Sequence, residues 1–251
     1  MICLIAKLGE YSISVLKHTA DFLSFTLSTL VNMPFVKLRR LFECVVRIGY
    51  TPIIIIAPIS TFAGIVLTIQ SKIALGVSES IAAELVSLAI VREIGPVVTG
   101  LVISGAVGSA ITADIATMQI TDQIRALRTM SINPIRYVIS PWILAGCIAM
   151  PLMVIFADTM GMFGVYLTLS NSKVIPPLSY WEHVTTFVNM GELAISVLKG
   201  LVFGWVITTI ATRKGYSAIE SVESIGNATT SGVSINAIFI LIIDCIFVLF
   251  G

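Results

Sequence analysis

The stretch TADIATMQITDQIRALRTMSINP, residues 112–134, is a hydrophilic island with strongly apolar segments on both sides. About twenty helical residues cover the roughly 30 Å hydrocarbon core of a bilayer. The segments at about 85–111 and 141–170 both reach that length. We therefore expect a membrane protein in which this island lies outside the lipid.

The composition of the whole chain agrees with this expectation. It is 57% hydrophobic and only 12% charged, with a mean hydropathy of +1.00. A soluble chain of 251 residues lacks the polar surface to cover so many apolar side chains. The net charge of +1 gives no reason to expect a nucleic-acid partner. The scattered cysteines and histidines predict no metal site, no disulfide framework and no bound cofactor.

Five apolar segments are predicted to cross the membrane, so the expected fold is an all-α polytopic membrane protein. Residues 10–32 and 35–48 precede them and have polar stripes at helical spacing, the second one basic, which is typical of interfacial helices. We divide the chain into an interfacial part, residues 1–50, and one transmembrane domain, residues 51–251. The five spans lie at about 51–70, 85–111, 141–170, 191–212 and 231–250.

Lysine and arginine are distributed unequally between the two sides of the predicted topology. Eleven of them lie on the side of the N-terminus and the island, whereas the two opposite loops hold only Lys72 and Lys173. Cytoplasmic loops are enriched in these residues. We therefore expect the N-terminus and the island in the cytoplasm, and the C-terminus on the outer side.

Small residues recur at intervals of four in the second and fourth spans. In lipid, such rows allow helices to approach closely, where apolar side chains alone give no reason to associate. We therefore expect helix contacts at these positions and a central place for the second span. The positions are Gly100, Ser104, Gly108, Gly200 and Gly204.

Four charged residues fall inside predicted spans at a similar depth below the outer surface: Arg92, Glu93, Lys199 and Asp244. Charges within a membrane are costly and usually face the protein interior or a wet path. Opposite signs at one level predict a single paired cluster. It is either a clasp that holds the bundle together or the lining of an outward-opening cavity for the head of an amphiphile, and both can be true. Asp158 lies deeper, near the midplane.

The island itself has the pattern of a short amphipathic helix. Thr121 is its predicted cap, Asn133-Pro134 is its predicted end, and the charged residues Asp122, Arg125 and Arg128 lie off its apolar stripe. A helix of this kind either lies on the bilayer or docks into a groove of a soluble partner. The pattern alone leaves both interpretations open.

Three ordered motifs carry a family resemblance: REIGPVVTGLV at 92–102, TMQITDQIRAL at 117–127 followed by MSINPIRY at 130–137, and GNATT at 226–230. With Gly215-Tyr216, they resemble the permease subunit of MCE-associated ABC transporters, the MlaE/YrbE family. The likeness runs from about Lys37 to the end of the chain. Two motifs depart from the family pattern: Asp114-Ile-Ala116 replaces Glu-x-Gly, and Thr121-Asp122-Gln123 replaces Thr-Glu-Gln, with Arg125 where an acidic residue is usual.

The resemblance implies a homodimer of permeases in the bacterial inner membrane. Each copy would bind an ABC ATPase through a coupling helix at about 114–134, and an MCE-domain protein would sit on the outer face. The cargo implied is phospholipid, moved between inner and outer membranes. The ATPase-docking residues implied are Asp114, Met118, Thr121, Asp122, Gln123, Arg125, Leu127 and Arg128.

The sequence offers little support for an enzyme or for another kind of transporter. The chain has no Walker A motif, so we expect the partner to use the ATP. Asp158 and Asp244 would suit an ion-coupled secondary transporter, but no inverted repeat is visible. A lipid-modifying intramembrane enzyme would need a nucleophile motif or a cluster of metal ligands, and neither is found.

Overall fold

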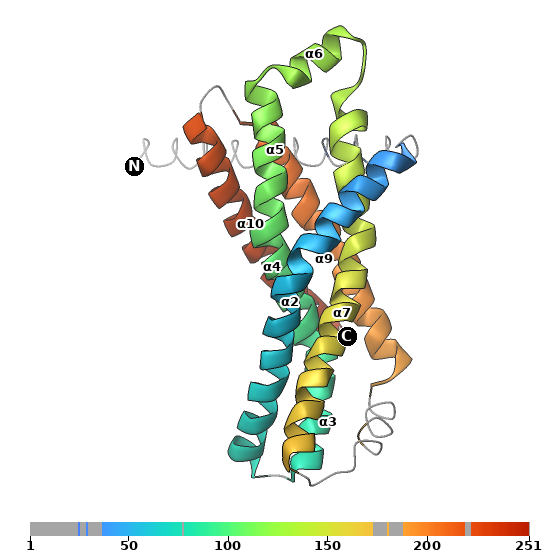
Figure 1. Ribbon diagram of the computed structural model, residues 1–251, viewed down its shortest axis with the longest axis vertical. Helices are drawn as coiled ribbons and strands as arrows, with labels where there is room; N and C mark the ends of the chain where they lie inside the picture. The colour runs from blue at the N-terminus through green and yellow to red at the C-terminus, as the bar shows by residue number, and fades with distance from the viewer. Residues whose placement is uncertain are drawn as a thin grey trace, which may run out of the picture.

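The computed structural model describes residues 37–76, 78–172, 188–218 and 222–250, together with Phe25, Thr29 and Tyr180. These residues form a helical bundle with five segments that are long and apolar enough to cross a membrane, and no strand occurs among them (Figure 1). The predicted all-α fold with five spans is confirmed. The interfacial helix predicted at 10–32 lies outside the described residues, apart from Phe25 and Thr29.

The first span, α2 (Leu38–Leu75), is one continuous helix. We predicted a surface helix at 35–48 separated from a span at 51–70, and that division is wrong. Pro52 and Pro58 lie inside α2 without ending it, since neighbouring helices in a membrane can compensate for the hydrogen bonds that proline removes. The first turns of α2 nevertheless have an apolar face and a basic face, as expected of an interfacial helix. Their exposed apolar stripe is Leu38, Phe42, Val46 and Tyr50.

The second span is longer than predicted and is built from pieces. It runs through α3 (Glu79–Ala89), α4 (Gly95–Ile103) and α5 (Ser109–Ile120). Two π-helical turns join these pieces, η2 (Ile90–Ile94) and η3 (Ser104–Gly108). The first part of the hydrophilic island therefore continues the span as helix to Ile120.

The separate helix of the island is short: α6 (Gln123–Thr129). Asp122 and Ser131 flank it with positive φ angles of 56° and 59°, and these left-handed residues turn the chain at both of its ends. We predicted that Asn133-Pro134 ends this helix, but α6 already ends at Thr129. Instead, the Asn133 Oδ1 atom accepts a hydrogen bond from the backbone N–H of Ile135, at 3.0 Å, and starts the next one.

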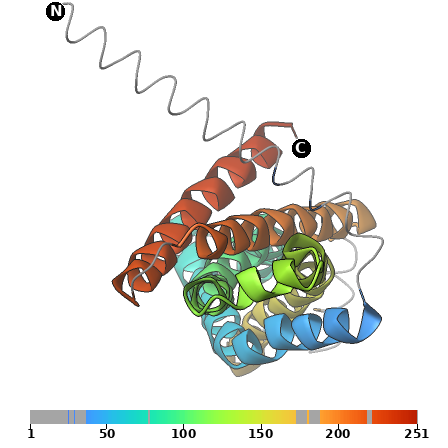
Figure 2. The same cartoon turned by 90° about the horizontal axis from the view of Figure 1, so that it is seen from above.

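The third span consists of η4 (Ile135–Ile139) and α7 (Ser140–Ser172), and it is the most buried of the five. It packs against α2 and against α9 (Met190–Tyr216). In the most apolar stretch of the third span, 67% of the residues are buried, compared with 50% in the corresponding stretch of the second span. The second span, which we predicted to be central, packs against all four other spans. The fifth span, α10 (Val222–Phe250), diverges along the edge of the bundle (Figure 2).

The closest helix contacts are made by glycines, only some of which were predicted. A Cβ atom on Gly204 would lie 2.3 Å from the carbonyl oxygen of Gly146, and one on Gly200 would lie 3.0 Å from Val154. At Gly100 and Gly108 the nearest side-chain atoms would be 3.4 Å away, and Ser104 is fully buried. The sequence patterns missed the pairing of α2 with α7, where a Cβ on Gly64 would lie 2.1 Å from the Gly161 oxygen.

We predict that Gly204→Ala destabilises the protein by about 2 kcal/mol, because the added methyl group meets backbone and forces α7 and α9 apart. Gly191→Ala is the matched control in the same helix, since nothing lies within 4 Å of its Cβ position. The measurement is the midpoint of thermal unfolding in detergent. Equal midpoints for the two variants would contradict the close α7–α9 contact.

Candidate functional site

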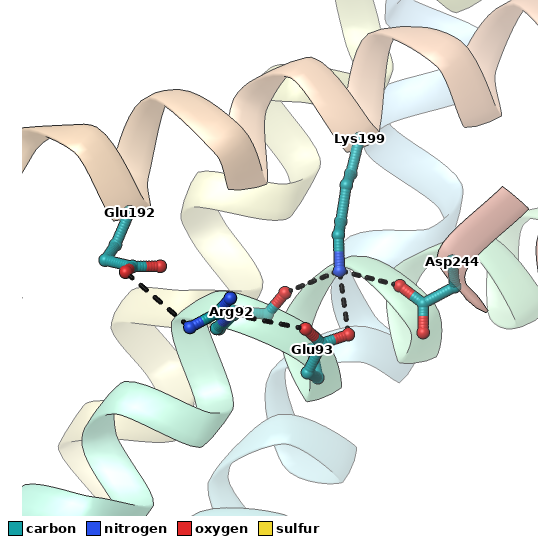
Figure 3. A network of polar contacts seen from close by, with 5 residues as sticks. All are labelled: Arg92, Glu93, Glu192, Lys199 and Asp244. Atoms are coloured by element: carbon teal, nitrogen blue, oxygen red, sulfur yellow. Dashed lines mark hydrogen bonds and ion pairs between the residues drawn. The ribbon is translucent and has the colours of Figure 1, made fainter. Parts of the chain in front are cut away.

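Lys199 lies at the centre of a polar network that joins three helical segments (Figure 3). Its ammonium group donates to Glu93 Oε2 at 2.7 Å, to Asp244 Oδ1 at 2.8 Å and to the carbonyl oxygen of Arg92 at 2.9 Å. A lysine ammonium has three N–H donors, so all of them are used. The four charged residues placed at one level from the sequence do meet in the structure.

Arg92 extends this network toward the start of α9. Its guanidinium group lies 3.8 Å from Glu93 and 3.9 Å from Glu192, which is in the first turn of α9. The five side chains of Figure 3 therefore alternate in sign, with three carboxylates and two cations. Sequence analysis missed Glu192. It precedes Lys199 by seven residues, which is two helical turns on one face, and that spacing could have revealed it.

The network is closed at one end and open at the other. The Lys199 side chain is 1% exposed, whereas that of Arg92 is 36% exposed. Arg92 and Glu93 both belong to the π-helical turn η2, and π turns inside α-helices are frequent at functional sites. A buried clasp with an accessible cationic end fits both interpretations of the cluster, the structural one and the cavity lining. The described residues hold no group of three or more His, Cys, Asp or Glu that could bind a metal.

Asp158 stands apart from this network, as its depth in the sequence indicated. It is buried in α7, and its Oδ2 atom accepts a hydrogen bond from Ser196 of α9 at 2.8 Å. A Cβ atom added to Gly95 would lie only 1.7 Å from the Asp158 Oδ1 atom. Any larger residue at position 95 would displace this carboxyl group, so the glycine that follows η2 gives Asp158 its place.

The helix α6 stands at one end of the molecule, beyond the spans that it connects (Figure 1). On the inner side of α6, Ile124 is buried. Arg128 donates a hydrogen bond to the Tyr216 hydroxyl at the end of α9. On its outer side Asp122 and Arg125 form an exposed ion pair at 3.3 Å. The helix is thus held by α9 while it presents charged groups outward.

The predicted docking residues separate into three groups in the structure. Those exposed at the tip are Thr121, Asp122, Gln123, Arg125 and Arg128. Met118 and Leu127 are half-buried and pack against the core. Asp114 lies more than one helical turn before the tip, where it forms an ion pair with Arg47 of α2 at 2.6 Å. It therefore connects α5 to α2.

Comparison with known proteins gives consistent results over nearly the whole chain. The family model described as Permease MlaE matches residues 41–250. The chain is 31% identical to the intermembrane phospholipid transport system permease protein MlaE of Haemophilus influenzae, over 98% of this chain and 97% of that protein. It is 32% identical to a probable ABC transporter permease protein of Rickettsia typhi, over 93% and 92% of the two chains. A probable ABC transporter permease protein of Synechocystis is 34% identical over 71% and 70%.

We predict that Lys199→Met destabilises the protein more than Glu93→Gln does. Removal of the lysine leaves two partly buried carboxylates without their shared cation, at a cost of about 3 kcal/mol. With Glu93→Gln, Lys199 keeps Asp244 and the Arg92 carbonyl, so a loss of about 1 kcal/mol is expected. Thermal unfolding in detergent measures both variants. A loss for Glu93→Gln as large as that for Lys199→Met would show that the lysine is not the centre of the network.

Proposed function

The chain belongs to the MlaE permease family, and from this we propose that it is the membrane-spanning subunit of an ABC transporter that moves phospholipid between the inner and outer membranes. The observation that carries this proposal is the likeness to the Haemophilus influenzae permease over 98% of the chain. The five apolar helices support it, because the transported lipid must pass a subunit embedded in the membrane.

A permease of this kind works with a separate ATPase, and we place the docking site on α6. The tip of α6 is exposed and charged, and it projects from the end of the bundle (Figure 1). The excess of positive charge on the same side supports a cytoplasmic position for α6 and for the N-terminus, and an outer position for the C-terminus. In this scheme the partner hydrolyses the ATP, and this chain is non-catalytic and binds no cofactor.

Two contacts connect α6 to α5 and α9, and a third joins α5 to α2; together they suggest how ATPase closure reaches the outer side. The Thr121-Asp122 turn joins α6 to α5, Arg128 joins it to α9 through Tyr216, and Asp114 joins α5 to α2. The span that ends in α5 carries Glu93, and α9 carries Lys199. A pull on α6 therefore acts on both halves of the Glu93–Lys199 ion pair.

The network around Lys199 then serves as a latch beside the lipid path. When Glu93 and Lys199 separate, the lysine and Arg92 become available to the phosphate of a lipid head. Exposed apolar faces on α2 and α10 support assembly with a second copy around such a path, since only 11% of the α10 window is buried in one chain. An MCE-domain protein on the outer face completes the proposed complex.

Charge reversal at the tip of α6 tests the docking site. In Asp122→Arg and Arg125→Glu the exposed pair is lost and the surface offered to the ATPase changes sign, so co-purification of the ATPase should fall about tenfold. Arg39→Glu is the control, because Arg39 is exposed on α2 and its ion-pair partner, Glu43, belongs to the same helix. Undiminished co-purification by both α6 variants would mean that α6 is only a surface helix.

Alanine substitution in the outer network tests the latch. We expect Glu93→Ala and Lys199→Ala to impair lipid transfer in proteoliposomes while the ATPase still co-purifies, because both residues lie far from α6 along their helices. Glu43→Ala, which removes an exposed carboxylate from α2, should transfer lipid normally. Full transfer by both network variants would rule out a role of the latch in transport.

A further inference from the structure

The last helix, α10, contacts the rest of the bundle along one narrow face. The buried residues among those described in α10 are four residues apart, which places them one above another on the same side of the helix. They are Gly232, Asn236 and Ile240. The other described side chains of α10 are exposed or half-buried. The position of α10 along the bundle therefore depends on this face and on its ion pair with Lys199.

The second span and α10 run antiparallel, and three pairs of facing residues define their register. One member of each pair is a glycine, and a Cβ atom added to it would lie 3.4–3.6 Å from a side-chain atom of the other member. Because glycine has no side chain, these positions offer little resistance to a movement of α10 along the second span. The pairs are Thr112 with Gly232, Gly108 with Asn236, and Gly100 with Ile240.

Two buried polar side chains in this region make no hydrogen bond to any group that the structure describes. They are Asn236, which is 1% exposed, and Ser104, which is fully buried. Both the oxygen and the nitrogen of the Asn236 amide lack a partner, and so does the Ser104 hydroxyl. Buried polar groups are nearly always paired, because an unpaired one costs free energy. This register of the two helices therefore leaves Asn236 and Ser104 unsatisfied.

Ser104 lies within about one helical turn of Asn236. It is four residues from both Gly100 and Gly108, and the turn η3 that it begins contacts α10. Its level is therefore between those of Ile240 and Asn236. A movement of α10 in the direction of η2 by up to one turn, roughly 5.4 Å, would bring the Asn236 amide to the Ser104 hydroxyl. Both groups can donate and accept, so they can form a hydrogen bond with each other.

The same movement would break the link between α10 and Lys199. Asp244 lies about two turns beyond Asn236, and its Oδ1 atom accepts a hydrogen bond from the Lys199 ammonium group at 2.8 Å (Figure 3). A shift of one turn removes this contact. Glu93 and the Arg92 carbonyl belong to the second span, so they stay with the lysine. One N–H donor of Lys199 then becomes free for a lipid phosphate.

We propose that α10 moves between two registers on the second span, and that a hydrogen bond between Asn236 and Ser104 holds it in the second register. In the first register, Asp244 holds α10 and the amide is unpaired. In the second, the amide is paired and Asp244 is released. Each register lacks a polar contact that the other makes, which is the property of a two-state element. The inference rests on the proposed function, because it makes Asn236 a positioning residue for lipid transfer.

A disulfide that fixes the first register tests the movement. In Thr112→Cys/Gly232→Cys the two side chains face each other at a separation that a disulfide can span. In proteoliposomes that contain the complex with its ATPase, oxidation should reduce ATP-driven lipid transfer about tenfold, and a reductant should restore it. The controls are Thr112→Cys and Gly232→Cys alone, in which oxidation should leave transfer unchanged.

Removal of the second contact tests Asn236 and Ser104. Asn236→Leu replaces an unpaired amide with an apolar side chain of similar size, so the midpoint of thermal unfolding should not fall, whereas lipid transfer should fall about fivefold. Ser104→Ala should lower transfer to a similar extent. The double variant should transfer as much lipid as either single variant, because both changes remove the same contact. Ser109→Ala is the matched control, since this hydroxyl bonds only to the backbone of its own span, and its transfer should be normal.

Four results would overturn the proposal. Full transfer by the oxidised cysteine pair would show that α10 need not move, and failure of the disulfide to form would show that the first register is not the resting one. A marked loss of stability in Asn236→Leu would show that the amide is already paired. Additive losses in Asn236→Leu and Ser104→Ala would show that they do not act through one contact.

The unmodified complex distinguishes this proposal from the proposed function. If it transfers lipid while any of the four results is found, the transport proposal stands and the movement of α10 does not. Absence of transfer by the unmodified complex would refute the transport proposal itself. If the reduced cysteine pair is inactive, the variants of Asn236 and Ser104 decide the test.

Discussion

A lysine ammonium that is buried in a bundle surrounded by lipid must be given acceptors, and this requirement determines how three helical segments stand relative to one another. Lys199 satisfies it with Glu93, Asp244 and the Arg92 carbonyl. Each acceptor comes from outside α9, so the fourth span cannot be placed independently of the second and the fifth. An unpaired charge at this depth would cost several kcal/mol (roughly 3 on insertion scales). The α10 helix shows the consequence most clearly, since it is mostly exposed and Asp244 is its ionic link to the bundle among the described residues.

The sequence was sufficient to predict this network because charges are rare in apolar spans and depth can be counted along a helix. It was not sufficient to predict where helices end. The span predicted at 51–70 stopped at the thickness of the hydrocarbon core, but α2 continues past it to Gly76, because Pro52 and Pro58 do not end the helix. The second span likewise continues beyond its predicted end at 111, as far as the turn at Asp122. It also failed to identify α7 as part of the most buried span. Among the glycines of α7, Gly146 packs against α9, whereas Gly161 and Gly164 pack against α2, so they form no regular row that a search at intervals of four can find.

The island was recognised as a helix from its pattern, and the structure shows why its docking role could not be read in the same way. The pattern treated residues 114–134 as one element, whereas the chain divides them among α5, α6 and a loop. Asp114 belongs to an ion pair within the bundle, which local spacing cannot reveal because Arg47 is far away in sequence. Arg125, which departs from the family pattern, has a local partner in Asp122. The tip of α6 therefore keeps both signs of charge, and its departure from the family pattern is balanced within one helical turn.

In the Lys199 network, the cations and the carboxylates satisfy one another inside the bundle. In the proposed transport cycle, a lipid phosphate therefore gains access to Lys199 only when a carboxylate moves away. Such an arrangement suits a site that opens and closes with a cycle of the partner, because its resting state is closed by its own ion pairs. A transporter whose cargo and whose solvent are both phospholipid needs a site that is closed at rest, because only such a site can distinguish the lipid it moves from the lipid that surrounds it.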